Sequence, residues 1–356
     1  KDSAGDDATD FILVQSPIED TPAFRAGVRA GDLITAVDGR STLEMSIDEA
    51  VEAIRGPEGT TVTISILRGR RNRIELEIER AIVEVPTVKY AMIEPDIGFL
   101  RIIQFTPHTV ERFREALEFF ERNDYGSMII DVRSNPGGLL SAVIDVADLF
   151  FDRGTIVGTA GRDPSENTRV TANQGTEVPD RLPIAVLIDE GSASASEILA
   201  GTLQDRNRAT LIGETTFGKV SVQQVHMVGD GGFRLTMSRY YLPSGRFIDE
   251  VGVDPDVEAT GIELTDEQTE AYFDLLEQGV IADWVRENPT PPPAEIDGFV
   301  EGLLADGVDI PELWLRRMVR DEVLYQNNET IVYDLKFDLV LQRAVELIRQ
   351  GELSRR

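Results

Sequence analysis

Strands and helices alternate through the middle of this 356-residue chain, and this alternation limits the folds that it can adopt. Short apolar runs of strand length are followed by segments with helical spacing of apolar residues. The expected strands are 97–102, 127–133, 184–189 and 210–213, and the expected helices are 109–123, 139–151 and 196–205. Because strands joined by helices usually run parallel, the pattern predicts a mostly parallel sheet covered by helices.

The flanking segments have other patterns, and the chain is too long for one ordinary core, so we expect three domains. Residues 1–85 form a β-rich module, 86–263 the α/β core and 264–356 a mainly helical C-terminal region. In the first, Ser46 and Glu49 have capping-box spacing at the start of a helix. In the last, prolines between 289 and 293 mark a break. Segments 309–324 and 335–349 have the apolar spacing of helices, which suits helix packing or a homo-oligomer.

Composition excludes several classes of function. The formal charge of −29 repels nucleic acid, which we exclude as a main partner. The absence of cysteine excludes disulfides and thiolate sites. The two histidines, His108 and His226, lie apart and outside any HExxH pattern, so we expect no metal site and no cofactor, and assign both to surface or capping positions. No apolar run reaches the length of a membrane span.

Small hydroxyl residues gather at the turn between strand 184–189 and the helix that follows it. Residues 190–198 read Glu-Gly-Ser-Ala-Ser-Ala-Ser-Glu-Ile. Ser194 is a candidate nucleophile because alanines flank it and a helix N-terminus offers N–H groups to an oxyanion. An alternative stays open from this segment alone, since Ser194 and Glu197 also have capping-box spacing.

A lysine in residues 216–219, Thr-Phe-Gly-Lys, supplies the base that a serine needs where histidine is scarce. We expect Lys219 at the start of a strand with apolar neighbours, partly removed from water, so that its neutral amine can accept a serine proton. Gln223 would share a strand face with Lys219 and orient the amine. A surface lysine is the alternative.

A second turn follows the strand at 127–133 and reads Ser-Asn-Pro-Gly-Gly over 134–138. Glycines allow backbone N–H groups to approach a substrate closely. The N–H groups of Gly138 and Ala195 could therefore form a two-donor oxyanion hole, with a plain turn as the alternative.

The order of these motifs resembles the carboxy-terminal processing proteases, the serine–lysine tail-specific peptidases of family S41. The motifs that carry the resemblance are Ile-Asp-Val-Arg-Ser-Asn-Pro-Gly-Gly at 130–138, Gly-Ser-Ala-Ser-Ala-Ser-Glu-Ile at 191–198, Gly-Glu-Thr-Thr-Phe-Gly-Lys at 213–219 and Tyr-Tyr-Leu-Pro-Ser-Gly-Arg at 240–246. The resemblance implies a multidomain α/β fold with a crotonase-like (ClpP/crotonase-type) protease core, a PDZ domain inserted or N-terminal, and a helical C-terminal region.

The resemblance also implies roles for single residues. Ser194 matches the nucleophile, Lys219 the general base and Gln223 the glutamine that orients the base. Gly138 and Ala195 match the backbone donors of the oxyanion hole.

Two further positions follow from the same comparison. Asp205 aligns with an acidic residue implicated in some members, and we keep it with Glu197 as a supporting residue. The family pattern F-G-K-G-x-V-Q has a glycine where this chain has Val220, a change that would alter the geometry or access beside the base.

The first domain resembles a PDZ domain through residues 16–34, which follow the pattern S-P-x-x-x-T-P-A-x-x-A-G-x-x-x-G-D-x-I. Such domains add a peptide strand to a sheet edge and bind its terminal carboxylate with a glycine-rich loop. That loop should precede Phe11, but residues 1–10 contain only Gly5. We therefore expect the N-terminal part of the domain to be incomplete.

Together these resemblances imply a serine endopeptidase that cleaves proteins near apolar or unstructured C-termini. An activating adaptor is a further candidate partner. The family implies an exported, periplasmic or envelope protein, membrane-associated in some cases, although we find no export signal in this chain. Two alternatives remain, a crotonase-like acyl-CoA enzyme and a non-catalytic or partner-activated PDZ scaffold.

Overall fold

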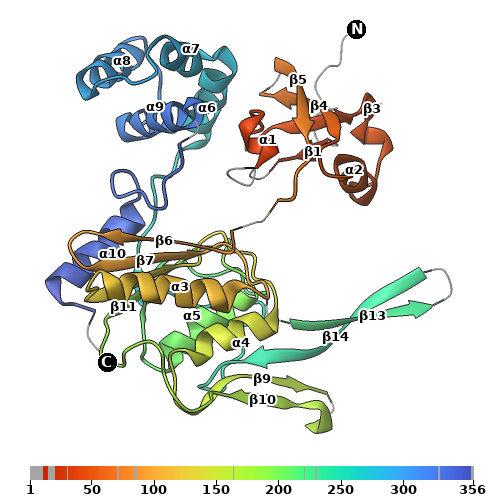
Figure 1. Cartoon of the computed structure of the whole chain (residues 1–356), viewed down its shortest axis with the longest axis vertical. Coiled ribbons are helices and arrows are strands. Elements are labelled where there is room, and N and C mark those ends of the chain that lie inside the picture. The colour runs from red at the N-terminus through yellow and green to blue at the C-terminus, as the bar shows by residue number, and fades with distance from the viewer. Residues whose placement is uncertain are drawn as a thin grey trace. The chain divides into compact units, whose positions relative to one another are not determined.

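The structure, a computed structural model, comprises two compact units that are each formed by two stretches of the chain (Figure 1). One unit contains residues 1–85 and 263–330, and the other contains 86–262 and 331–356. The structure describes residues 11–14, 21–29, 31–69, 72–83, 86–162, 164–219, 221–228, 231–327 and 329–353, without the side chains of 48, 166, 221–228 and 231–237.

A six-stranded sheet forms the centre of the second unit. Its order is β15 (Val257–Glu258), β12 (Thr210–Gly213), β11 (Ile184–Ile188), β8 (Ser127–Asp131), β7 (Ile97–Ile102) and β6 (Val88–Ile93). All neighbouring pairs are parallel except β6 with β7. The expectation of a mostly parallel sheet is confirmed.

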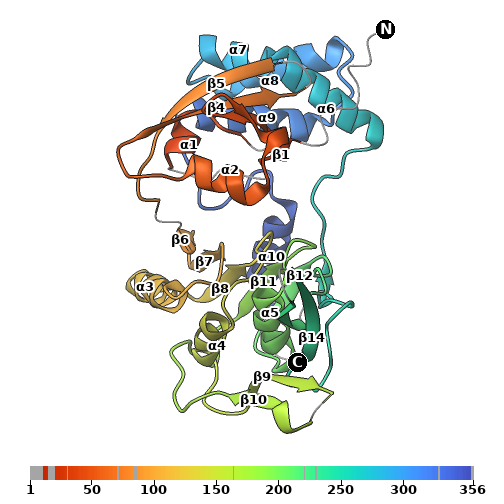
Figure 2. The same cartoon turned by 90° about the vertical axis from the view of Figure 1, so that its right-hand side faces the viewer.

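Helices cover both faces of this sheet, which explains why its strands are apolar at nearly every position (Figure 2). On one face lie α3 (Thr109–Arg122), α4 (Leu140–Asp148) and α5 (Ala195–Asp205). On the other face α10 (Leu339–Gln350) packs Leu341, Ala344 and Val345 against the strands. Parallel strands present their carboxyl ends at one edge, so the turns after β8 and β11 come together.

The expected C-terminal region, 264–356, has residues in both units. Residues 331–353 belong to the unit of the sheet because α10 buries its apolar stripe there. An ion-pair network adds to this docking. Arg133, just after β8, donates to Asp131 and to Asp338, and Asp338 in turn caps α10 by accepting from the N–H of Leu341 at 2.9 Å.

The Asp131–Arg133 pair makes the stability of this unit depend on pH. Burial acts to raise the pKa of the Asp131 carboxyl, but the charge and hydrogen bonds of Arg133 outweigh it and hold the pKa below its usual value. A depressed pKa adds stability that is present above the unfolded value of about 3.9 and is lost as pH falls. We expect Asp131→Asn to lower the free energy of unfolding by about 3 kcal/mol at pH 7.

Denaturant unfolding at pH 7, 5 and 3.5 tests this prediction. The difference between wild type and Asp131→Asn should narrow below about pH 4, because the Asp131 carboxyl of the unfolded wild type then takes up a proton and the folded state, with its lowered pKa, does not. Asp152→Asn is the control, since the Asp152 side chain is 64% exposed. A difference that stays constant across the range would contradict the assignment.

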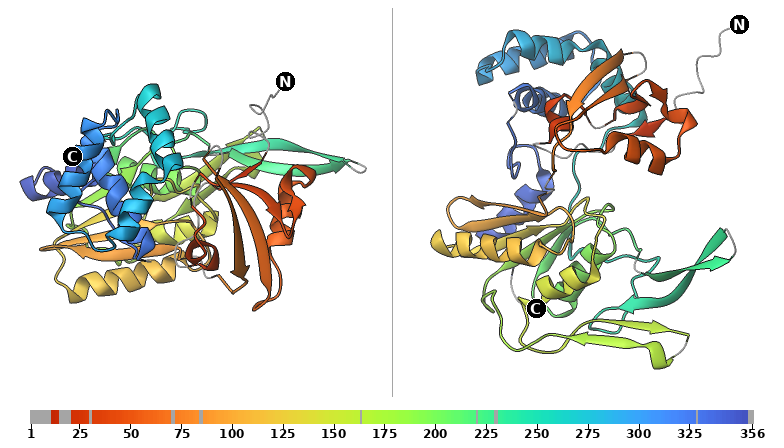
Figure 3. Two further views of the ribbon diagram at one scale, coloured as in Figure 1. Left: turned by 90° about the horizontal axis from the view of Figure 1, so that it is seen from above. Right: turned by 45° about the vertical axis from the view of Figure 1, so that its right-hand side comes forward.

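A second, antiparallel sheet in the same unit includes a long hairpin. Its order is β10 (Thr168–Thr171), β9 (Thr155–Gly161), β14 (Gly231–Tyr241) and β13 (Ser221–Val228). The hairpin of β13 and β14, turquoise in Figure 3, extends away from the parallel sheet. Because β13 begins two residues after Lys219, the hairpin starts beside the candidate base.

The first unit joins a small antiparallel sheet to a group of helices. The sheet and its helices are β1 (Ile12–Leu13), α1 (Pro22–Arg25), β2 (Leu33–Val37), β3 (Arg40–Ser41), α2 (Ile47–Ile54), β4 (Thr61–Arg68) and β5 (Asn72–Glu79). The predicted capping box of Ser46 and Glu49 is confirmed at the start of α2. The expected carboxylate loop before Phe11 lies outside the described residues.

The helices of this unit are α6 (Asp266–Gln278), α7 (Val280–Glu287), α8 (Pro293–Ala305) and α9 (Glu312–Gln326). The proline-rich break separates α7 from α8, as expected. An ion pair of Arg29 with Glu322 at 2.8 Å connects α9 to the small sheet domain, and Arg29 also lies over the ring of Tyr325. Among the described helices of the chain, none is long and apolar enough to cross a membrane.

Candidate active site

Ser194 occupies the sharp turn between β11 and α5. It is the N-cap residue of α5 with φ 57° and ψ −110°, a backbone region that costs a non-glycine residue about 1–3 kcal/mol. Its side chain is half-buried. Serine hydrolases on other α/β folds use such a strained strand-to-helix turn to present the nucleophile Oγ.

The carboxylate of Glu197 holds this turn to the loop that carries the candidate base. Glu197 is fully buried and accepts the N–H of Ser194 at 2.9 Å, as its capping-box spacing predicts. It also accepts the Thr216 hydroxyl at 2.6 Å and the N–H groups of Gly218 at 2.7 Å and Lys219 at 3.0 Å. One side chain therefore fixes the backbones of both Ser194 and Lys219.

The turn after β8 lies against the Ser194 turn. Gly137, with φ 101°, has no room for a side chain, because a Cβ there would lie 2.8 Å from the Cβ of Ser194 and 2.9 Å from the nitrogen of Ala195. Within the described part of the chain, the N–H groups of Gly138 and Ala195 have no acceptor. The two predicted oxyanion donors thus lie in adjacent turns, with their hydrogen-bonding capacity unused.

Asn135 holds the two turns together from inside. It is fully buried, and its backbone carbonyl accepts the N–H of Ala193 and the hydroxyl of Ser196, both at 3.0 Å. Its side chain donates to the carbonyl of Ile102 at 2.8 Å and accepts the N–H of Gly137 at 2.8 Å. The Gly137 N–H is thereby occupied, which leaves Gly138 as the free donor of this turn.

The position of Lys219 differs from the sequence expectation. Lys219 precedes β13 and lies in the loop after Gly218, and its side chain is exposed, so the expected removal from water is wrong in this conformation. In the described part of the chain, the Lys219 amine has no hydrogen-bond partner. Gln223 lies in β13 after a bulge, its side chain lies outside the description, and so does Val220.

Asp205 lies too far from Ser194 to support it directly. It ends α5, whose eleven residues separate the two by about 16 Å at about 1.5 Å per residue. Its carboxylate accepts the N–H of Ser244 at 2.9 Å and forms an ion pair with Arg246 at 3.0 Å. Asp205 therefore stabilises the Tyr-Leu-Pro-Ser-Gly-Arg turn after β14, because it satisfies backbone and charge there.

The crowding at Gly137 gives a prediction with a matched control. We expect Gly137→Ala to lower activity about 100-fold, because the new methyl group must push Ser194 or Ala195 aside. Gly175 has φ 103° and nothing within 4 Å of a built Cβ. Gly175→Ala should therefore lose about 1–2 kcal/mol of stability to backbone strain, measured as a lower melting temperature, and should retain its activity. Equal activity of both variants would contradict the close approach of the two turns.

The arrangement matches what a serine-type hydrolase requires, since a strained serine lies at the carboxyl edge of a mostly parallel sheet beside two N–H donors that have no acceptor in the described part of the chain. Sequence comparison agrees with this class. The profile of peptidase family S41 matches residues 96–259, and the profile of the PDZ domain matches residues 13–68. This chain belongs to peptidase family S41.

Named relatives are similar over most of this chain. A carboxy-terminal-processing protease of Bartonella bacilliformis is 45% identical over 253 residues, which are 69% of this chain and 58% of that protein. A carboxyl-terminal-processing protease of Synechocystis sp. is 38% identical over 286 residues, 76% of this chain and 66% of that protein. The chain thus spans about two thirds or less of the length of these relatives.

Among solved structures, a photosystem II D1 C-terminal processing protease matches with a TM-score of 0.51 and 30% identity. The match covers 70% of this chain and 69% of that one.

Proposed function

We propose that this chain is a serine endopeptidase that cleaves proteins near their C-termini through an acyl-enzyme on Ser194. The observation that carries the proposal is that the N–H groups of Gly138 and Ala195, in turns that touch at Ser194, have no acceptor among the described residues. Preorganised donors of this kind stabilise the oxyanion of acyl transfer. Backbone donors suit a peptide carbonyl, and family membership supports the same chemistry.

In this mechanism the Lys219 amine accepts the proton of the Ser194 hydroxyl as Oγ attacks the scissile carbonyl. The developing oxyanion accepts the N–H groups of Gly138 and Ala195. Lys219 then returns the proton to the leaving amine, and the acyl-enzyme forms. Water, activated by the same amine, hydrolyses the ester. Gln223 orients the amine during both steps.

The Lys219 side chain is exposed and its amine has no partner among the described residues, which supports a resting state in which the dyad is open. Binding of substrate, or of an activating adaptor, would bring the amine to Ser194. Catalytic hydrogen bonds are often long in free enzymes and tighten only in the complex. Activity that depends on a partner would therefore use the same mechanism.

For substrates, we propose proteins with apolar or unstructured C-termini, which the PDZ domain would select by strand addition. The names of the relatives support C-terminal processing. We further propose a crotonase-like arrangement of the core, export to the cell envelope and a homo-oligomer through the C-terminal helices.

Mass spectrometry of the products of two unfolded test proteins tests this function. The proteins differ only in the last ten residues, which are apolar in one and acidic in the other. We expect cleavage near the apolar tail by wild type and no cleavage by Ser194→Ala. Turnover of an acyl-CoA thioester without peptide cleavage would favour the crotonase-like alternative. Wild-type cleavage that Ser194→Ala retains would contradict the proposal.

A further inference from the structure

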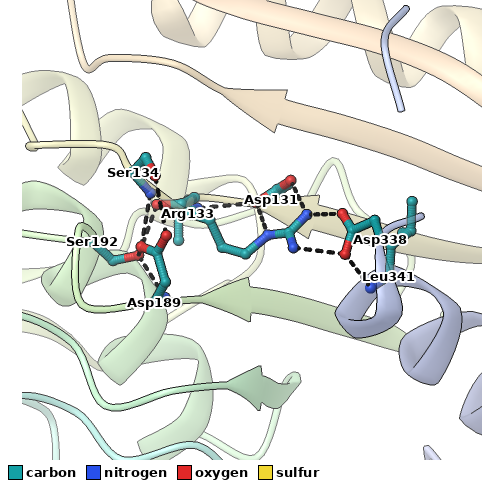
Figure 4. Close-up of polar contacts among 8 residues, drawn as sticks. Asp131, Arg133, Ser134, Asp189, Ser192, Asp338 and Leu341 are labelled. Carbon is teal, nitrogen blue, oxygen red and sulfur yellow. Dashed lines mark hydrogen bonds and ion pairs between the residues drawn. The ribbon is translucent and has the colours of Figure 1, made fainter. Parts of the chain in front are cut away.

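Asp189 makes contacts that none of the proposed catalytic steps uses. It follows β11 directly, and its carboxylate accepts hydrogen bonds from both turns of the site (Figure 4). From the turn after β8 it accepts the N–H of Ser134 at 2.8 Å and the Ser134 hydroxyl at 3.1 Å. From the turn before the nucleophile it accepts the N–H of Gly191 at 3.0 Å, and the Ser192 hydroxyl lies 3.0 Å from the same oxygen but shares its one proton with the carbonyl of Val132 at 2.8 Å.

The residue that Asp189 holds is strained. Ser134 has φ 55°, in the left-handed region that non-glycine residues adopt at a cost of about 1–2 kcal/mol. The nucleophile has almost the same φ of 57°. In each case a carboxylate accepts the N–H of the strained serine, Asp189 for Ser134 at 2.8 Å and Glu197 for Ser194 at 2.9 Å. The two turns that carry the oxyanion donors are therefore fixed in the same way.

The two turns are also in direct contact at this point. A Cβ built on Gly191 would lie 2.8 Å from the Cα of Ser134, so one turn cannot shift without moving the other. Buried Asn135 connects the same turns through its backbone carbonyl. Asp189 is only half-buried, so we assign its contribution to its hydrogen bonds.

We propose that Asp189 is a positioning residue that sets the spacing of the Gly138 and Ala195 N–H groups by clamping Ser134 to the turn before the nucleophile. The proposal rests on the proposed peptidase function. Asp189 touches no reacting atom in this mechanism, and it acts through the geometry of the oxyanion hole. Loss of the clamp lets Ser134 relax towards a commoner backbone conformation, which displaces Gly138 four residues later.

Steady-state cleavage and the affinity of a peptide boronate test this assignment in the full chain. The boronate forms a tetrahedral adduct on a serine, so its affinity reports on the oxyanion hole. We expect Asp189→Ala to lower kcat and boronate affinity about 10- to 100-fold with KM within about twofold, since a displacement near 1 Å can have an effect of this size. Asp189→Asn keeps the Oδ1 acceptor of the Ser134 and Gly191 N–H groups and should stay within about threefold of wild type.

Glu190→Ala is the matched control, because it removes an exposed carboxylate from the adjacent position. It should leave kcat and boronate affinity unchanged. If Asp189→Ala does not fold, Asp189→Glu tests the positioning role in its place, because its longer side chain keeps the charge but displaces the acceptor oxygens. Loss of kcat and boronate affinity at constant KM in that variant supports the proposal.

Wild-type kcat in Asp189→Ala, or in Asp189→Glu where it takes its place, overturns the assignment. A loss in Asp189→Asn as large as that in Asp189→Ala also overturns it, because charge and not the acceptor would then matter. The proposed function fails separately, if wild type does not cleave or if Ser194→Ala retains cleavage.

Discussion

Ser194→Ala is expected to lower kcat for peptide cleavage about a million-fold, the size found when the nucleophile of a serine protease is removed. The residual rate would come from binding and the oxyanion hole alone. Progress curves with a fluorogenic peptide, combined with mass spectrometry of the product, measure this loss. The substitution also places alanine at φ 57°, so part of any change in melting temperature comes from the backbone.

Ser194→Gly separates the two effects, since glycine adopts this φ without strain. It should be as inactive as Ser194→Ala and melt at a temperature at least as high. If Ser194→Gly retained more than a few per cent of wild-type activity, Ser194 would not be the nucleophile.

Replacement of Glu197 is expected to lower both the stability and the activity of the protein. Glu197→Ala leaves the donors of Ser194, Thr216, Gly218 and Lys219 without their acceptor at a buried site. A buried donor without a partner costs about 1–3 kcal/mol, so we expect a loss of about 3 kcal/mol or more in the free energy of unfolding. We expect kcat to fall about 100-fold as the Ser194 turn and the base loop separate.

Glu197→Gln should give an intermediate result. Its amide nitrogen cannot accept, so one pair of donors, on either the Oε1 or the Oε2 side, loses its partner. Denaturant unfolding and kcat measure both effects, with Glu118→Gln on the exposed side of α3 as the control. An active, fully stable Glu197→Ala would mean that the carboxylate does not fix the two backbones.

The parallel sheet and its helices could be predicted from the sequence, because apolar runs of these lengths and separations fit few other arrangements of strands and helices. The same pattern correctly predicts the start of α5 next to Ser194 and the capping box of α2. Strand β5 is absent from the predicted elements, although Ile74, Leu76 and Ile78 alternate with glutamates and carry the signal. Strands β9 and β10 carry a weaker sequence signal, because threonine and glycine interrupt the apolar positions of β9 and threonine those of β10.

The site was only partly predictable. Local spacing predicts the bond from Glu197 to the Ser194 N–H, because both lie in one helical turn. Its bonds to residues 216–219 depend on how a separate loop packs, about twenty positions along the chain. The contact of Arg133 with Asp338 could not be predicted for the same reason, because the two residues lie 205 positions apart in the chain. Apolar neighbours suggested a strand at Lys219, yet Gly218 with φ 81° keeps it in a loop.

The central claim is that Lys219 activates Ser194, and the rate at which a fluorophosphonate labels Ser194 tests it most directly. Lys219→Ala should label about 10²- to 10⁴-fold more slowly than wild type. Lys219→Arg should not restore the rate, because a guanidinium stays protonated. Labelling of Lys219→Ala at the wild-type rate would contradict the account.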